Sequence, residues 1–117
     1  MIIKRKKDQK VIKSPLCGNL IEVIKNNSFG IVKAVNIGTT GKHYHKIATE
    51  TYHLLSGELV ILVEKGNERS EVILKSGDVL VLEPFDVHKI VKASDRNEMI
   101  VTNVPEWQAV DEIEIKE

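Results

Sequence analysis

The chain has 117 residues and equal numbers of basic and acidic side chains, 17 Lys plus Arg and 17 Asp plus Glu. A chain of this size forms one compact core, and its balanced charge excludes the strong overall attraction to nucleic acid or anionic membranes that basic proteins show. No stretch approaches the roughly eighteen apolar residues of a membrane span, and the charged start MIIKRKKDQK lacks the apolar run of a secretory signal. Cys17 is the only cysteine, which fits a reducing compartment, and we expect it to be a small buried residue. The composition therefore predicts a single-domain cytoplasmic protein that binds neither nucleic acid nor membrane.

Short apolar runs rich in Val and Ile follow one another along the chain, and turn residues separate them. The predicted strands cover residues 20–24, 29–37, 52–63, 71–74, 79–82, 90–93 and 99–104. Residues such as Asn, Gly, Ser and Asp lie between these runs, at spacings typical of an antiparallel sandwich or barrel. No segment before the tail has a helical period of useful length. The predicted fold class is therefore all-β.

The tail, residues 105–117, allows two interpretations. Trp107, Val110 and Ile113 recur every three residues, as on one face of a helix. Ile113 and Ile115 also alternate as they would in a strand. The sequence leaves the conformation of the tail open.

Three of the four histidines lie within the stretch GKHYHKIATETYHLLSGE, and two of them are only two residues apart. On an extended strand His43 and His45 point to the same face, with their Cα atoms roughly 6.5 Å apart. A chain that turns back after His45 brings Glu50 beside them. A further strand, introduced by the turn at residues 76–78, could return His88 to the same interior.

Alternation along the strand that contains Glu50 divides its side chains between two faces. If Glu50 faces the histidines, Tyr52 and Leu54 face the same interior. Thr51, His53 and Leu55 then face outward, so His53 is predicted to be a surface or subunit-contact residue rather than a ligand.

Each of these features is weak by itself. A lone His-x-His is common on half-buried strands, an isolated glutamate is usually a surface charge, and a lone buried histidine usually bonds to the backbone. Together, three imidazoles and one carboxylate would form a mixed nitrogen and oxygen donor set for a metal ion. Such a set suits Fe, Mn, Ni, Co, Cu or Zn as divalent ions, and the sequence does not choose among them.

Two motifs carry a resemblance to a known family. GTTGKHYHKIATETYHLLSG resembles the first motif of the cupin superfamily, and GDVLVLEPFDVH resembles the second. The resemblance spans residues 38–88, about half of the chain. It implies a double-stranded β-helix, or jelly-roll, barrel made of one cupin domain over residues 1–117. The motifs occupy residues 38–57 and 77–88, and flanking strands or tails occupy 1–28 and 105–117.

The resemblance also implies that one divalent transition metal binds to His43, His45, Glu50 and His88. On an octahedral ion these four ligands leave two positions open, whereas on a tetrahedral zinc ion they fill the coordination sphere. The cupin resemblance implies the open arrangement. This sequence departs from the usual pattern at Lys92, which replaces an asparagine often found four residues after the last histidine.

Cupins with this ligand set include dioxygenases, oxalate-degrading enzymes, sugar-phosphate isomerases and proteins that only bind a ligand. The preferred hypothesis is a metal-dependent, dioxygenase-like oxidoreductase that acts on a small polar metabolite. The alternatives are a sugar-phosphate isomerase or a non-catalytic, metal-dependent protein that binds a small ligand. Tyr52, as an inward donor, and Lys92, as a cation on the His88 face of an unbroken strand, are the predicted substrate-binding residues.

A homodimer is the predicted assembly. Small sandwiches have edge strands that must be covered, and apolar residues outside the motifs could cover them. These residues are Val11 and Ile12 near the start and Trp107, Val110, Ile113 and Ile115 near the end. The alternative is a monomer whose tail folds back on its own barrel.

Overall fold

The computed structural model describes residues 1–117 and contains β-strands with two short 3-10 turns. The six-stranded sheet contains β1 (Lys10–Ser14), β2 (Gly18–Lys25), β3 (Gly30–Val35), β10 (Glu98–Val104), β5 (Thr49–Ser56) and β8 (Val79–Leu82), in that order. The five-stranded sheet contains β11 (Ile113–Glu114), β4 (His43–Tyr44), β9 (Val87–Ala93), β6 (Glu58–Lys65) and β7 (Glu68–Lys75). The 3-10 turns are η1 (Lys6–Asp8) and η2 (Ala109–Asp111).

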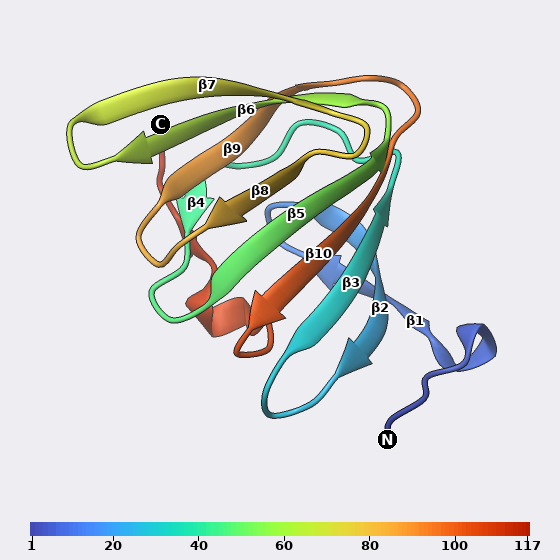
Figure 1. Ribbon diagram of the computed structural model, residues 1–117. Helices are drawn as coiled ribbons and strands as arrows, with labels where there is room; N and C mark the ends of the chain where they lie inside the picture. Colours follow the sequence, from blue (N-terminus) through green and yellow to red (C-terminus); the bar gives the residue numbers. More distant parts are fainter.

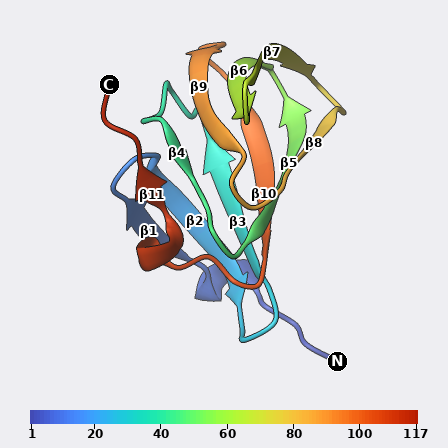
Figure 2. The same ribbon diagram turned by 90° about the vertical axis from the view of Figure 1, so that its left-hand side faces the viewer.

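The two sheets face each other, and every strand pair within them is antiparallel (Figures 1 and 2). Non-consecutive strands such as β10 and β3 lie side by side, so the chain crosses repeatedly between the sheets. The prediction of an all-β jelly roll is confirmed. No helix in the structure is long and apolar enough to cross a membrane.

The strand β5 shows the predicted alternation. Glu50, Tyr52 and Leu54 are buried, whereas His53 and Leu55 are exposed. This arrangement follows from the period of two in an extended chain that has one face against a core. The inward face of β5 therefore carries both core residues and a candidate ligand.

A glycine divides the predicted strand 52–63 into β5 and β6. Gly57 has a φ of +92°, a left-handed conformation that side chains rarely adopt. A Cβ at this position would also lie 2.6 Å from the carbonyl oxygen of Arg96. Gly57 therefore permits the tight turn that moves the chain from one sheet to the other.

The core lies between the sheets and consists of aliphatic side chains from both. Leu54 on β5 and Leu59 and Ile61 on β6 are fully buried, and Leu82 and Ile90 contribute from β8 and β9. These residues belong to one cluster of buried apolar side chains. The histidines occupy another part of the same interior.

Truncating Leu54 should destabilise the protein far more than truncating its neighbour. Leu54 is 0% exposed and Leu55 is 44% exposed. Leu54→Ala is expected to reduce the free energy of unfolding by about 2–5 kcal/mol, because it removes buried methyl groups and leaves a cavity. Leu55→Ala, the matched control, should change it by about 0.5 kcal/mol or less. Urea unfolding measures both values, and equal losses would contradict this assignment of the core.

Two strands and the tail differ from the sequence-based expectation. The strand β1 was not predicted, because it has only two apolar residues between lysines. The expected strand through His43 and His45 is shorter in the structure, where β4 contains only His43 and Tyr44. The tail forms η2 and then β11, where Ile113 pairs with Tyr44 and Glu114 pairs with His43. The tail therefore folds back on its own barrel. This arrangement is the one that the sequence analysis gave as the alternative to a tail that covers the strand edge of a second subunit.

Candidate metal centre

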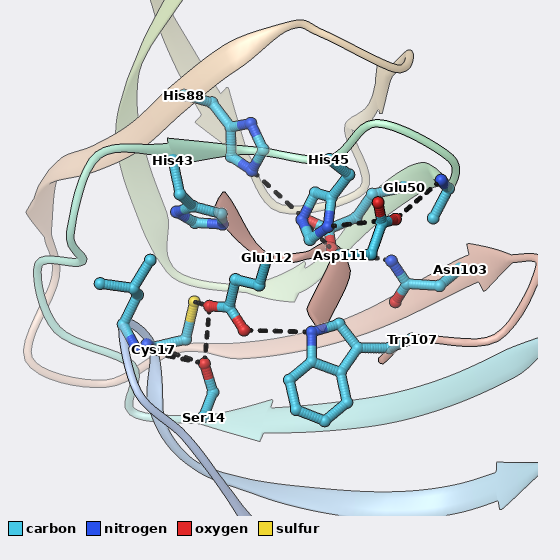
Figure 3. A network of polar contacts seen from close by, with 12 residues as sticks. Ser14, Cys17, His43, His45, Glu50, His88, Asn103, Trp107, Asp111 and Glu112 are labelled. Atoms are coloured by element: carbon cyan, nitrogen blue, oxygen red, sulfur yellow. Dashed lines mark hydrogen bonds and ion pairs between the residues drawn. The ribbon is translucent and has the colours of Figure 1, made fainter. Parts of the chain in front are cut away.

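The four predicted ligands converge from both sheets. His43 lies on β4 directly opposite His88 on β9, His45 follows β4, and Glu50 lies on β5 of the other sheet. Their exposed fractions are 1% for His43, 3% for His45, 5% for Glu50 and 2% for His88. One ligand atom from each residue lies within 4.8 Å of those of the other three, and Figure 3 shows the side chains directed toward one another. The structure therefore brings together the residues of a metal-capable site.

Backbone carbonyl groups orient two of the imidazoles. His43 Nδ1–H donates to the carbonyl oxygen of Gly41 at 2.8 Å, and His88 Nδ1–H donates to that of Asp86 at 2.9 Å. Because a carbonyl oxygen only accepts, each of these Nδ1 atoms carries the proton. The Nε2 lone pair of each ring is then free to bind a metal, as in many metal sites whose ligands are held by outer partners.

Several ring nitrogens in this pocket have no hydrogen-bond partner. These atoms are Nε2 of His88 and both Nδ1 and Nε2 of His45, and all three are buried. Buried polar atoms in proteins are nearly always paired, because an unpaired one retains its desolvation cost. A bound divalent ion would satisfy one nitrogen of each ring. The residues present therefore fit a metal ion.

Glu50 supplies the negative charge of the pocket. Its Oε2 accepts a hydrogen bond from Asn103 Nδ2 at 2.9 Å, and its oxygens lie 3.4 Å from Nε2 of His45 and of His88. Burial by itself would raise the pKa of this carboxyl group, but contacts with His88, His45 and Asn103 outweigh burial and lower the pKa below its usual range. Glu50 is therefore an ionised carboxylate, the form that binds metals.

Asn103 is a functional residue that the sequence analysis missed. It is 1% exposed and pairs with Glu50 across the β10–β5 ladder. An alternation signal was present, because Met99, Val101 and Asn103 share the inward face of β10. A polar residue at the third inward position of an otherwise apolar strand indicates a specific partner in the interior.

The imidazoles differ in their affinity for a proton. Burial lowers the pKa of His43 from 6.5 to about 4. Burial also disfavours the charged form of His88, but the ion pair with Glu50 and the hydrogen bond to Asp86 raise its pKa above 6.5. A proton therefore competes with a metal ion more strongly at His88 than at His43.

Metal affinity should therefore fall as the pH is lowered. The folded protein raises the pKa of His88 above its usual value of 6.5. Protons therefore begin to compete with the metal ion for His88 at a pH above 6.5. We expect affinity for Mn(II) to fall about tenfold per pH unit once His88 holds a proton, since each bound ion must displace that proton. Titrations between about pH 8 and about pH 6 at constant ionic strength measure the effect. An affinity that is constant over this range would contradict the prediction.

A small cavity adjoins the candidate ligands. Leu20, Val32, Met99 and Val101 contribute to its apolar wall, and His43, His45 and Glu50 are among its polar lining residues. It offers about 30 Å³ to the centres of water-sized molecules. Because one water needs roughly 10–15 Å³ by this measure, the cavity has room for about two or three water-sized groups.

The two predicted substrate-binding residues occupy different places. Tyr52 is buried, lines the cavity and lies with its ring centroid 6.1 Å from that of His88. Burial and the negative charge of Glu50 raise the pKa of its hydroxyl group well above 10, so Tyr52 remains a hydrogen-bond donor. Its position agrees with the predicted inward orientation.

Lys92 is exposed and does not line the cavity. The predicted position required an unbroken strand, but the register of β9 against β6 shifts between Ile90 and Lys92. A bulge of this kind inserts one extra residue and reverses the side-chain alternation beyond it. Lys92 therefore lies outside the group of residues that converge at the site.

The C-terminal segment supplies polar groups that the sequence analysis did not connect to the site. Asp111 is buried and accepts hydrogen bonds from the backbone N–H groups of Lys46, Ile47 and Ala48. Its Oδ2 lies 3.9 Å from Nδ1 of His45. The segment that follows Pro105 thus holds the loop between two candidate ligands, His45 and Glu50.

Residues 34–105 match the cupin domain family. The chain belongs to the cupin family. Comparison with curated proteins finds no match. Among solved structures, this cupin is similar to Pac13 of Streptomyces, a nucleoside dehydratase, with a TM-score of 0.75 and 15% identity over 99% of this chain and 92% of Pac13. At this identity the similarity establishes the fold.

Two further solved structures share the fold of this cupin. KdgF from Halomonas sp. has a TM-score of 0.71 and 15% identity, covering 89% of this chain and 94% of KdgF. An oxalate decarboxylase variant from Bacillus subtilis has a TM-score of 0.77 and 12% identity, covering 98% of this chain and 33% of the decarboxylase. The structural neighbours therefore include enzymes of different kinds.

Proposed function

We propose that this cupin is a metal-dependent, dioxygenase-like enzyme that acts on a small polar metabolite. The observation that carries the proposal is the set of buried, unpaired imidazole nitrogens around an ionised carboxylate. His43, His45, Glu50 and His88 would hold a divalent transition metal. When bound, such an ion would act as a Lewis acid on substrate oxygens and, if it is iron, would support reaction with dioxygen.

The residues around the ligands support small-molecule chemistry in a pocket with a largely apolar wall. Asn103 holds the carboxylate of Glu50 in place, and the neutral hydroxyl group of Tyr52 can donate a hydrogen bond to a substrate oxygen. The apolar wall reduces the access of water, which strengthens electrostatic interactions inside the site. These residues would orient a substrate and keep its surroundings poor in water.

Sugar-phosphate isomerisation has less support than oxygenase chemistry. No lysine or arginine lines the cavity, and Lys92 lies outside it. Phosphate groups are usually held by Arg, Lys or helix N-termini, because these groups supply positive charge and several donors. The cavity provides none of them.

Metal analysis of protein purified without added metal is the first test of the proposal. About one transition metal ion per chain is expected, and a His45→Gln variant should retain almost none. Dioxygen consumption by iron-loaded protein is then measured with a panel of enolisable acids, diketones and hydroxyketones. Metal binding without turnover of any compound would favour the non-catalytic, ligand-binding alternative, and absence of metal binding would contradict the proposal.

We also propose that the protein forms a homodimer. The outward face of β8 exposes Val79 and Val81, and β8 is an edge strand of its sheet. Exposed apolar side chains beside an open strand edge are a common interface between subunits. Sedimentation of the wild type and of a Val79→Lys variant tests this assembly, with a wild-type monomer contradicting it.

A further inference from the structure

Glu112 places a second carboxylate in the cavity, opposite the candidate ligands. It follows η2 in the C-terminal segment and lines the cavity together with Ser14, Cys17 and Trp107 (Figure 3). One of its oxygens lies within 4.8 Å of a ring nitrogen of His43. That separation is too long for a direct hydrogen bond, but one ligand atom that lies beside the line between the two groups can contact both of them.

Three donors hold this carboxylate in a fixed orientation. Ser14 Oγ–H donates to Oε1 at 2.8 Å, the Cys17 thiol contacts the same oxygen at 3.7 Å, and Trp107 Nε1–H donates to Oε2 at 3.2 Å. A carboxylate offers about four acceptor positions. Both positions of Oε1 are used, so Oε2 retains one position for a donor that is not part of the protein.

The charges around the cavity favour a neutral occupant. Glu50 and Glu112 are the acidic residues that line it, and no lysine or arginine does so. With three neutral imidazoles, the two carboxylates balance the two positive charges of a divalent ion. An anionic ligand would add a negative charge that nothing in the cavity compensates, and an uncompensated buried charge is costly.

We propose that Glu112 is a specificity-determining residue that accepts a hydrogen bond from a hydroxyl group of a small neutral ligand and disfavours carboxylates and phosphates. This inference rests on the proposed function, because it places the ligand beside the metal centre. The small volume of the cavity limits the ligand to a few non-hydrogen atoms. The substrate class is therefore a small hydroxylated carbonyl compound or a similar neutral alcohol.

Hydroxyacetone and glycolate are matched probes for this inference. Both carry one hydroxyl group and the same number of non-hydrogen atoms, but a charged oxygen in glycolate replaces the methyl group of hydroxyacetone. The protein is first loaded with Co(II), and the visible spectrum of the ion then reports the affinity for each probe. Wild type, Glu112→Gln and the matched control Glu114→Gln are compared, since Glu114 is an exposed carboxylate in the same segment.

Glu112→Gln is expected to raise the affinity for glycolate relative to hydroxyacetone by about tenfold, because it removes a negative charge beside the ligand. Glu114→Gln should change this ratio by about twofold or less, since an exposed charge is screened. An unchanged ratio in Glu112→Gln would overturn the inference. Glu112→Asp, which keeps the charge, should retain the discrimination against glycolate.

A measurement on the wild type keeps the inference testable if the variant does not fold. Trp107 is the only tryptophan, so its indole N–H gives a single signal in an NMR spectrum of ¹⁵N-labelled protein. Because this N–H donates to Glu112, hydroxyacetone should shift the signal of protein loaded with a diamagnetic divalent ion that accepts six ligands, such as Cd(II). Saturation with hydroxyacetone and no shift would overturn the inference. If the protein binds no metal, the proposed function fails, and the same titration of metal-free protein decides the role of Glu112.

Discussion

Replacing His45 with glutamine should lower the affinity of the protein for Mn(II) or Fe(II) by about a hundredfold or more. Both ring nitrogens of His45 are buried without a hydrogen-bond partner, and its Nε2 lies 3.4 Å from Glu50 Oε2. Loss of an outer partner of a metal ligand typically costs 10–100-fold in affinity, so loss of a ligand should cost at least as much. Glutamine preserves approximate size and neutrality, which limits the change to the donor atom.

His53→Gln is the matched control for this variant. His53 lies on β5, the strand that carries Glu50, but its side chain is exposed on the outward face. Its replacement should leave metal affinity within about twofold of the wild type, because surface substitutions away from a site usually have small effects. Isothermal titration of both variants with Mn(II) measures the difference. Equal losses of affinity in the two variants would contradict the assignment of His45 as a ligand.

Removal of the Asp111 carboxylate should lower the free energy of unfolding, because this side chain accepts hydrogen bonds from three backbone N–H groups. Asp111 accepts backbone hydrogen bonds at 3.0 Å from Lys46, 3.1 Å from Ile47 and 3.0 Å from Ala48. Asp111→Ala leaves the buried N–H group of Ala48 without a partner, which costs about 1–3 kcal/mol, whereas the N–H groups of Lys46 and Ile47 belong to exposed residues and can bond to water. The expected loss in the free energy of unfolding is therefore about 2–3 kcal/mol.

Urea unfolding measures this loss, provided that the dependence of the free energy of unfolding on urea concentration is the same in the variant and the wild type. Glu114→Ala is the control, because Glu114 is an exposed carboxylate three residues further along the same segment, and it should cost about 0.5 kcal/mol or less. Asp111→Asn keeps one acceptor oxygen and should have an intermediate effect. A loss below about 1 kcal/mol for Asp111→Ala would show that the three N–H groups find other partners.

The same variant should affect the metal centre indirectly. The loop that Asp111 holds connects His45 to Glu50, and Asp111 Oδ2 lies 3.9 Å from His45 Nδ1. Anchoring this loop reduces the number of conformations in which the two ligands are apart, so its release would add an entropic cost to metal binding. The C-terminal segment therefore contributes to both stability and the geometry of the candidate site.

Local periodicity in the sequence was sufficient to predict much of the interior. A strand alternates its side chains with a period of two, so the inward position of Glu50, Tyr52 and Leu54 and the outward position of His53 follow from the order of residues along one strand. The spacing of His43, His45, Glu50 and His88, with the family resemblance, likewise predicted the convergence that the structure shows. These predictions needed no knowledge of which strands are neighbours, with one exception. The position of His88 required that β9 return to the interior that holds the other ligands.

Lys92 shows where local periodicity fails. Its predicted position depended on four residues of regular strand after His88, and the bulge opposite Val60 and Ile61 interrupts that regularity. A bulge is a property of the pairing between two strands, in which two residues oppose one. The sequence of β9 alone contains no sign of it.

Contacts between distant segments were decided only by the tertiary structure. Asn103 meets Glu50 because β10 pairs with β5 in one particular register. Asp111 and Glu112 reach the site because the tail turns at η2 and then adds β11 beside β4, although its sequence allowed either a helix or a strand. The alternation of residues along the chain thus determined which side chains face inward, whereas the register and crossing of the strands decided which of them meet, because pairing energy depends on partners that lie far away in the sequence.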